Sequence, residues 1–131
     1  MRIEDHHIIE EVLEIHQLEF GDFFFFDDFV VGQIHEEELF NWSKASVVIK
    51  LAEKLYGTGC MPHYISNRIY DYSIIAQDWL TFFQNRYVLK SYIIVTYKDS
   101  SVMNMMFEKL FLKETIITKC KSLDDALSIV K

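Results

Sequence analysis

The chain has 131 residues, half of them apolar (50%), and its 20 Asp and Glu against 13 Lys and Arg give a formal net charge of −7. This length and apolar content predict one globular domain over residues 1–131. The acidic balance argues against a nucleic-acid partner, because phosphate contacts need clustered Lys and Arg. No apolar run approaches the ~20 residues that span a bilayer, so we expect no transmembrane segment.

The cysteine content favours a reducing compartment. Cys60 and Cys120 are far apart in the sequence, and neither belongs to a C-x-x-C motif. The first residues do not have the pattern of a secretory signal peptide. We therefore expect reduced thiols and a cytoplasmic location.

The N-terminal third predicts an antiparallel meander. Residues 1–15 fit a helix or an extended chain, and we expect a poorly ordered or extended segment there. Apolar runs then predict three strands, with turns at the polar dipeptides between them: strands at His16–Phe20, Phe23–Phe26 and Phe29–Ile34, turns at Gly21-Asp22 and Asp27-Asp28. Four consecutive phenylalanines leave the middle strand without a polar face, so it is expected to be covered on both sides.

The hydrophobic period then changes to that of a helix. Asn41 is a good N-cap for apolar positions that recur at helical spacing as far as Tyr56. Gly57 follows where a helix end favours a left-handed residue. Next come a short apolar strand, Pro62–Ser66, and Ser73 as the candidate N-cap of a second helix.

The last forty residues predict two more strands and two more helices. In chain order these are a strand at Ser91–Tyr97, a helix capped by Ser100 or Ser101 and ending near Leu112, a strand at Thr115–Lys119, and a C-terminal helix opened by a capping box of Ser122 and Asp125. The resulting order, β-β-β-α-β-α-β-α-β-α, predicts an α/β fold with a mixed sheet. Its parallel strands are joined by helices, and the antiparallel meander lies at one edge.

Several segments resemble small bacterial proteins of the STAS-like (SpoIIAA-like) family. They are FGDFFFFDDFVVGQIHE (Phe20–Glu36), LFNWSKA (Leu39–Ala45), YISNR (Tyr64–Arg68) with the pair Tyr72-Ser73, and SLDDAL (Ser122–Leu127). The resemblance implies a STAS-like fold from about residue 16 onward. STAS regulators carry a phosphorylated Ser, usually preceded by Asp, and the resemblance places that position at Ser66, or at Ser73 if the turn is longer. The Asp and the Gly that follows the Ser are both missing here, so we expect neither serine to be phosphorylated.

A polar stretch after the predicted Pro62–Ser66 strand is a candidate ligand site. Its members are Asn67, Arg68, Tyr70, Asp71, Tyr72 and Ser73. In open α/β sheets, ligands bind in the crevice beyond the carboxyl ends of the strands. There Arg68 would hold an anionic group, assisted by the backbone N–H groups at Ser73. The structural alternative is that Arg68 pairs with Asp71, Ser73 caps the helix and the tyrosines pack over the sheet.

The predicted third helix is apolar over about 180° of its circumference, whereas a surface helix needs a stripe of only ~100°. Its polar positions are Asn104, Glu108 and Lys109, which are expected to face solvent. Its apolar face either covers the core or forms a surface for a protein partner or a second copy. The candidate interface residues are Met103, Met106, Phe107, Leu110 and Phe111.

Motifs for catalysis or metal binding are missing from the sequence. There is no G-x-S-x-G elbow and no glycine-rich phosphate loop, and the histidines and cysteines do not have the H-x-x-x-H or C-x-x-C spacing of metal ligands. We therefore expect a non-enzymatic, cytoplasmic binding or regulatory domain without a metal or cofactor, which acts through a protein partner or by self-association. The alternative is a small-ligand or lipid-binding module that uses the crevice at Asn67–Ser73.

Overall fold

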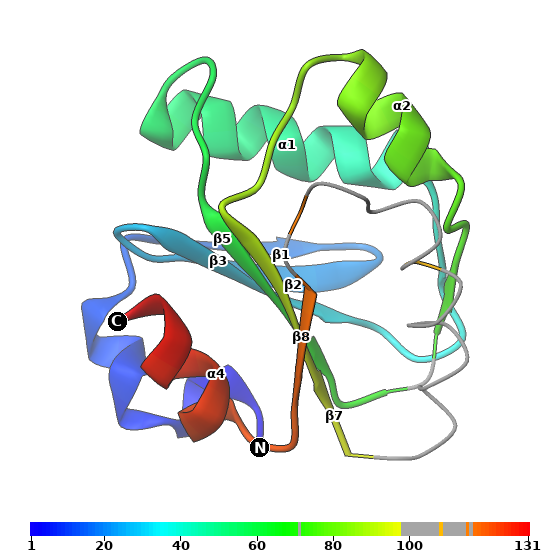
Figure 1. The fold of residues 1–131 in the computed structure, drawn as a ribbon. Coiled ribbons are helices and arrows are strands. Elements are labelled where there is room, and N and C mark those ends of the chain that lie inside the picture. The colour runs from blue at the N-terminus through cyan, green and yellow to red at the C-terminus, as the bar shows by residue number, and fades with distance from the viewer. Residues whose placement is uncertain (71, 98–107, 109–114, 116) are drawn as a thin grey trace.

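The computed structural model describes residues 1–70, 72–97, 108, 115 and 117–131. The described residues form three layers (Figure 1). A six-stranded sheet lies in the middle, with helices α1 (Trp42–Tyr56) and α2 (Asp78–Gln84) on one face. Helix α4 (Leu123–Val130) covers the other face together with two N-terminal 3₁₀ turns, η1 (Ile3–Asp5) and η2 (His7–Glu11).

The sheet is mixed, as the sequence predicts. Its strands are β1 (Glu14–Leu18), β2 (Gly21–Phe25), β3 (Phe29–Ile34), β5 (His63–Arg68), β7 (Ser91–Thr96) and β8 (Ile117–Cys120). They lie in the order β1-β2-β3-β5-β7-β8, with the first three antiparallel and the later ones parallel. Two short strands, β4 (Leu39–Phe40) and β6 (Ser73–Ile74), pair with each other outside this sheet. The α/β class and the edge position of the meander are confirmed.

The local signals for helix ends are confirmed at α1 and α4. The Asn41 side chain accepts a hydrogen bond from the backbone N–H of Lys44 at 3.1 Å, and Gly57 follows the helix with φ of 102°. The Ser122 hydroxyl accepts one from the backbone N–H of Asp125 at 3.2 Å. Apart from Glu108, the helix predicted to start at Ser100 or Ser101 lies outside the described residues, as do all five candidate interface residues.

The predicted turn at Gly21-Asp22 is wrong. Both residues belong to β2, and the chain reverses two residues earlier, at residues 19–20. The glycine serves close strand packing: a Cβ at Gly21 would lie 2.9 Å from the carbonyl oxygen of Gln33 and 3.0 Å from Cα of Ile34. A glycine beside an acidic residue is a turn signal in sequence, but here the neighbouring backbone is what requires it.

Strand β5 is longer than predicted, and Ser73 is not an N-cap. The strand continues through Asn67 and Arg68, which pair with Val95 and Thr96 of β7. Ser73 lies in β6, where its backbone N–H donates to the carbonyl of Glu38 at 2.8 Å, and α2 begins only at Asp78. Tertiary pairing therefore overrides the local preference of these polar residues for a turn.

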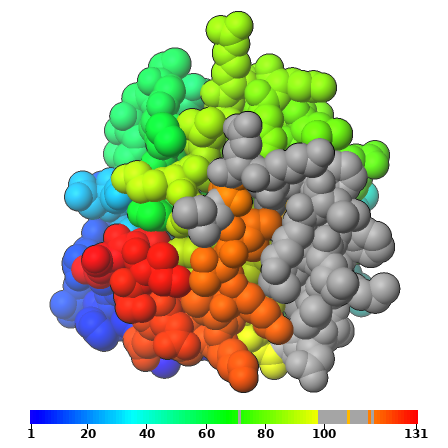
Figure 2. Space-filling view, in the orientation of Figure 1, coloured from blue at the N-terminus to red at the C-terminus, as the bar shows by residue number. Residues whose placement is uncertain are grey.

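The chain ends lie close together on the α4 face. Figure 2 shows the C-terminal residues (red) against the N-terminal ones (blue). His6 Nε2 lies 2.7 Å from Asp124 Oδ1, and Lys131 Nζ donates to Glu11 Oε1 at 2.8 Å. Ile3 is fully buried in the same layer. The N-terminal segment thus contributes to the core.

Candidate functional site

Two polar clusters lie at the carboxyl end of β5, on opposite faces of the sheet. Successive side chains of a strand point to opposite faces. Ser66 and Arg68 therefore face α1 and α2, whereas Asn67 faces the N-terminal segment. We call the first group the Arg68 cluster (Ser66, Arg68, Tyr72, Trp79, Tyr92 and Glu108).

The Arg68 cluster contains a buried ion pair. Arg68 Nη2 donates to Glu108 Oε1 at 2.6 Å and to the Tyr92 hydroxyl at 2.7 Å. The second carboxylate oxygen of Glu108 accepts from the indole N–H of Trp79 at 3.0 Å. The side chains of Arg68 and Glu108 are 3% and 0% exposed. Such a pair is expensive to desolvate, so its geometry and additional hydrogen bonds decide whether it is tolerated.

The surrounding groups keep Arg68 charged. Burial alone would lower the pKa of Arg68, but the hydroxyls of Tyr72 and Tyr92 and the Glu108 carboxylate raise that pKa well above its ordinary value. Burial raises the pKa of Tyr92, so its hydroxyl keeps its proton. The Arg68 guanidinium carbon also lies 5.6 Å from the centre of the Tyr72 ring. Among the buried side-chain nitrogens and oxygens of the described residues, Arg68 Nη1 makes no hydrogen bond.

Glu108 is the member of this cluster that sequence reasoning placed wrongly. It was expected on the solvent side of the third helix, yet it is fully buried. Its partners Arg68 and Trp79 are 40 and 29 residues away in the chain, so no local pattern reveals them. A charged residue is buried only where paired, and the pairing here comes from the tertiary fold.

An apolar cavity of about 120 Å³ lies beside the Arg68 cluster, between α1, α2 and the sheet. Helix α1 lines it with small and branched side chains: Ala45, Val48, Ile49 and Ala52. Aromatic side chains line much of the rest: Phe40, Trp42, Tyr64, Tyr72, Trp79, Phe82 and Tyr92. Glu108 also lines it, so the buried ion pair borders the cavity directly.

A glycine in β3 makes room for part of the wall. A Cβ at Gly32 would lie 2.3 Å from the hydroxyl of Tyr64 and 2.9 Å from the ring of Phe23. Tyr64 can therefore lie across β3 and stack on Tyr92, with ring centres 5.7 Å apart. The aromatic wall depends on this missing side chain.

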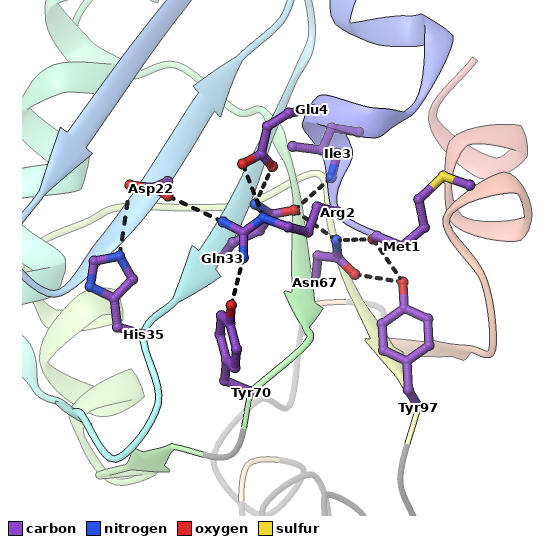
Figure 3. A network of polar contacts seen from close by, with 10 residues as sticks. All are labelled: Met1, Arg2, Ile3, Glu4, Asp22, Gln33, His35, Asn67, Tyr70 and Tyr97. Atoms are coloured by element: carbon purple, nitrogen blue, oxygen red, sulfur yellow. Dashed lines mark hydrogen bonds and ion pairs between the residues drawn. The ribbon is translucent and has the colours of Figure 1, made fainter.

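On the other face, Asn67 belongs to a network around Gln33 (Figure 3). Gln33 is 1% exposed, and its Oε1 accepts from the backbone N–H of Ile3 at 2.7 Å and from Asn67 Nδ2 at 2.9 Å. Its Nε2 donates to Glu4 Oε1 at 2.8 Å. Tyr97 donates to Asn67 Oδ1 at 2.8 Å. This network fastens the N-terminal segment to the ends of β3, β5 and β7.

Arg2 extends the same network toward the meander. It donates to the Tyr70 hydroxyl at 2.8 Å and to Glu4 Oε2 at 3.1 Å, and its Nη2 lies 3.5 Å from Asp22 Oδ2. Figure 3 shows these side chains converging from the N-terminal segment, β2 and the chain after β5. Tyr70 is therefore engaged by the protein itself.

The predicted ligand residues are thus divided by the fold. Arg68 and Tyr72 lie together on the cavity side, and Asn67 and Tyr70 lie in the network on the other face. Ser73 is exposed in β6. Asp71 lies outside the described residues, and Arg68 pairs with Glu108.

The two serines considered for phosphorylation differ in exposure. Ser66 is 1% exposed, and its hydroxyl contacts Arg68 Nε at 3.2 Å and the Tyr72 hydroxyl at 2.8 Å. A kinase would have to break both contacts to reach it. Ser73 is accessible, but without an N-cap role it has no helix N-terminus to stabilise an added phosphate.

A Ser-His-Asp arrangement lies at the opposite end of the strands. Ser91 Oγ is 2.6 Å from His63 Nδ1, and His63 Nε2 is 3.7 Å from Asp28 Oδ2. The second distance is too long for a hydrogen bond, and Asp28 instead accepts from Lys90 Nζ at 2.8 Å. The aspartate does not orient the imidazole, so the arrangement lacks the geometry of an acyl-transfer triad.

We predict that His63 weakens the fold in mild acid. Burial lowers the pKa of His63, Asp28 opposes this and Lys90 adds to it. Below the ordinary histidine pKa of about 6.5, the unfolded chain therefore binds more protons at this site than the folded one, and stability falls as the pH drops. The free energy of unfolding, measured by urea titration from about pH 7.5 to about pH 5, should fall more steeply for the wild type than for His63→Gln. If the unfolding free energies of the wild type and of His63→Gln change with pH in parallel, His63 is not the cause of the acid destabilisation.

Other candidate chemistry is sparse in the part of the chain that the structure describes. No group of three or more His, Cys, Asp and Glu side chains is arranged there to hold a metal ion. None of the described helices has the length and apolar character needed to cross a membrane. Cys60 and Cys120 are free, and burial raises the pKa of both thiols.

Comparison with known proteins adds no assignment. The STAS-like relationship therefore stays a prediction, because the chain matches no protein-family model, no curated protein and no solved structure.

Proposed function

We propose that the protein is a non-enzymatic binding module that takes a small apolar molecule into the cavity between α1, α2 and the sheet. The observation that carries this proposal is the cavity of about 120 Å³, lined by aromatic and aliphatic side chains with a buried polar cluster in its wall. Ligand sites in proteins have this composition: mostly apolar surface with a few placed polar groups that fix orientation.

The proposal modifies the sequence-based alternative. The expected crevice at Asn67–Ser73 is replaced by a cavity that adjoins only part of that stretch, through Tyr72 and the partners of Arg68. The first expectation, a protein partner or self-association through the third helix, depends on residues outside the described part of the chain. It stays a prediction without a specific observation in its favour.

Benzene is the first probe, because apolar cavities of ~150 Å³ bind it. We expect saturable NMR shifts at cavity-lining residues and a gain in unfolding free energy of about 1.4 kcal/mol at tenfold excess over Kd. Ala45→Leu puts three more carbons into the cavity and should weaken benzene binding at least tenfold. Val47→Leu on the exposed face of the same helix is the matched control and should bind like the wild type. A folded wild type without shifts at the lining residues would refute the proposal.

A further inference from the structure

We infer that the cavity accepts a neutral, planar single-ring molecule that carries a hydroxyl group, that is, a phenol. This inference rests on the proposed function and specifies its ligand class. It is carried by three properties of the wall: the shape of the aromatic lining, the balance of charge, and the unused hydrogen-bonding capacity of Tyr92 and Glu108.

The shape of the wall favours one flat ring. Tyr64 and Tyr92 stack with an angle of 15° between their planes, and Trp79 is tilted by 51° against Tyr92 with ring centres 5.1 Å apart. Aromatic surfaces of this kind favour offset or edge-to-face packing with another ring. The cavity of about 120 Å³ is slightly smaller than the ~150 Å³ that holds benzene in other proteins, which limits the buried part of a ligand to one ring.

The charges in the wall disfavour an anion. Two carboxylates, Glu108 and Asp78, line the cavity. Arg68 is the cation of the cluster, but it is already neutralised by Glu108 at 2.6 Å. A carboxylate or phosphate would enter beside two like charges without a cation left to pair with it, and burying an unpaired charge is costly.

A cation is also less suited than a neutral group. Each Glu108 oxygen already accepts a hydrogen bond from a strong donor, Arg68 or Trp79. Asp78 Oδ2 accepts from the backbone N–H of Trp42 at 2.7 Å, at the positive end of α1. Both carboxylates therefore have compensation from the protein, and a buried ammonium would gain little in return for its desolvation.

The hydrogen bonds left over match a hydroxyl group. The Tyr92 oxygen accepts from Arg68, and within the described residues its own O–H has no acceptor, so it can donate into the cavity. Each oxygen of the Glu108 carboxylate accepts one hydrogen bond in that same part of the structure and retains a second lone pair. A phenolic hydroxyl can accept from Tyr92 and donate to Glu108 at once, and benzene can do neither.

The test compares five one-ring probes on the whole chain by NMR titration: phenol, benzene, anisole, benzoate and benzylammonium. We expect phenol to bind about tenfold more tightly than benzene, the gain from one net hydrogen bond. Anisole cannot donate and should lose that advantage, and benzoate and benzylammonium should bind more weakly than phenol. In Tyr92→Phe, the ratio of phenol affinity to benzene affinity should fall from about ten toward one, whatever the affinity for benzene itself. If that variant does not fold, the comparison of phenol with anisole on the wild type still decides.

The failures can be told apart. If benzene binds and phenol binds no better, the hydroxyl assignment is overturned and the proposed function stands. If benzoate or benzylammonium binds more tightly than phenol, the neutral class is overturned. If none of the five probes shifts the lining residues of the folded protein, the inference and the proposed function fail together.

Discussion

Replacing Arg68 with methionine is expected to destabilise the folded protein by about 3–5 kcal/mol. The substitution removes the cation but leaves the Glu108 carboxylate, which is 0% exposed, without its charged partner. It also removes the donor to the Tyr92 hydroxyl. Truncating one side of a buried ion pair costs more than the net value of the pair, because the other charge stays desolvated. Urea unfolding followed by circular dichroism should show a lower midpoint with an unchanged slope.

A second substitution separates the effect of the unpaired Glu108 charge from the effect of lost packing around Arg68. In the double variant Arg68→Met with Glu108→Met, no charge is left uncompensated, and most of the stability should return. Lys131→Met is the control at an exposed pair with Glu11, where both side chains are about half exposed, and it should cost no more than about 1 kcal/mol. If Arg68→Met costs no more than Lys131→Met, Glu108 is not held in the core by Arg68.

The elements with purely local signals could be predicted from the sequence. The cap at Asn41 and the glycine at position 57 delimit α1, and the N-cap at Ser122 opens α4. Each signal acts within one helical turn, so the sequence contains all of it. The meander followed from alternating apolar runs and polar breaks, and the parallel strands from the alternation of strands with helices.

Elements that depend on remote partners could not be predicted in this way. The end of β5 looks like a turn because Asn67 and Arg68 are polar, yet both have partners in the folded protein. Arg68 finds Glu108 at a separation of 40 residues, and Asn67 finds Gln33 at 34. Polar residues are tolerated inside a strand when such partners exist. The local sequence does not show where these remote partners lie in the folded protein.

Only part of the candidate site could be predicted from the sequence, for the same reason. Sequence reasoning identified Arg68 and Tyr72, but it grouped them with Asn67 and Tyr70, which the fold places on the other face. One signal was available in the sequence. If the predicted strand Pro62–Ser66 is extended by two residues, the alternation of side chains along a strand places Asn67 and Arg68 on opposite faces of the sheet. The cavity had no such signal, because its wall is assembled from several helices and strands.

Replacing Gln33 with methionine is expected to destabilise the protein by about 2–4 kcal/mol, because it leaves buried donors without an acceptor. The amide oxygen of Gln33 accepts from the Ile3 backbone and from Asn67, and its nitrogen donates to Glu4. Methionine has a similar length but replaces none of these bonds.

The effect should be concentrated in the N-terminal segment. In Gln33→Met, the amide proton of Ile3 should exchange with solvent much faster, since its acceptor is gone. The exchange rates of the β7 amides should rise only by the factor that corresponds to the loss of global stability. Gln17→Met, at an exposed position of β1, is the matched control and should stay within about 0.5 kcal/mol of the wild type. If the two methionine variants are equally stable, the Gln33 side chain does not hold the N-terminal segment. Suppose instead that stability falls but the amide of Ile3 stays as protected as the amides of β7. The loss of stability would then come from the sheet, because the Ile3 amide donates to Gln33 and should be the first to exchange when that acceptor is removed.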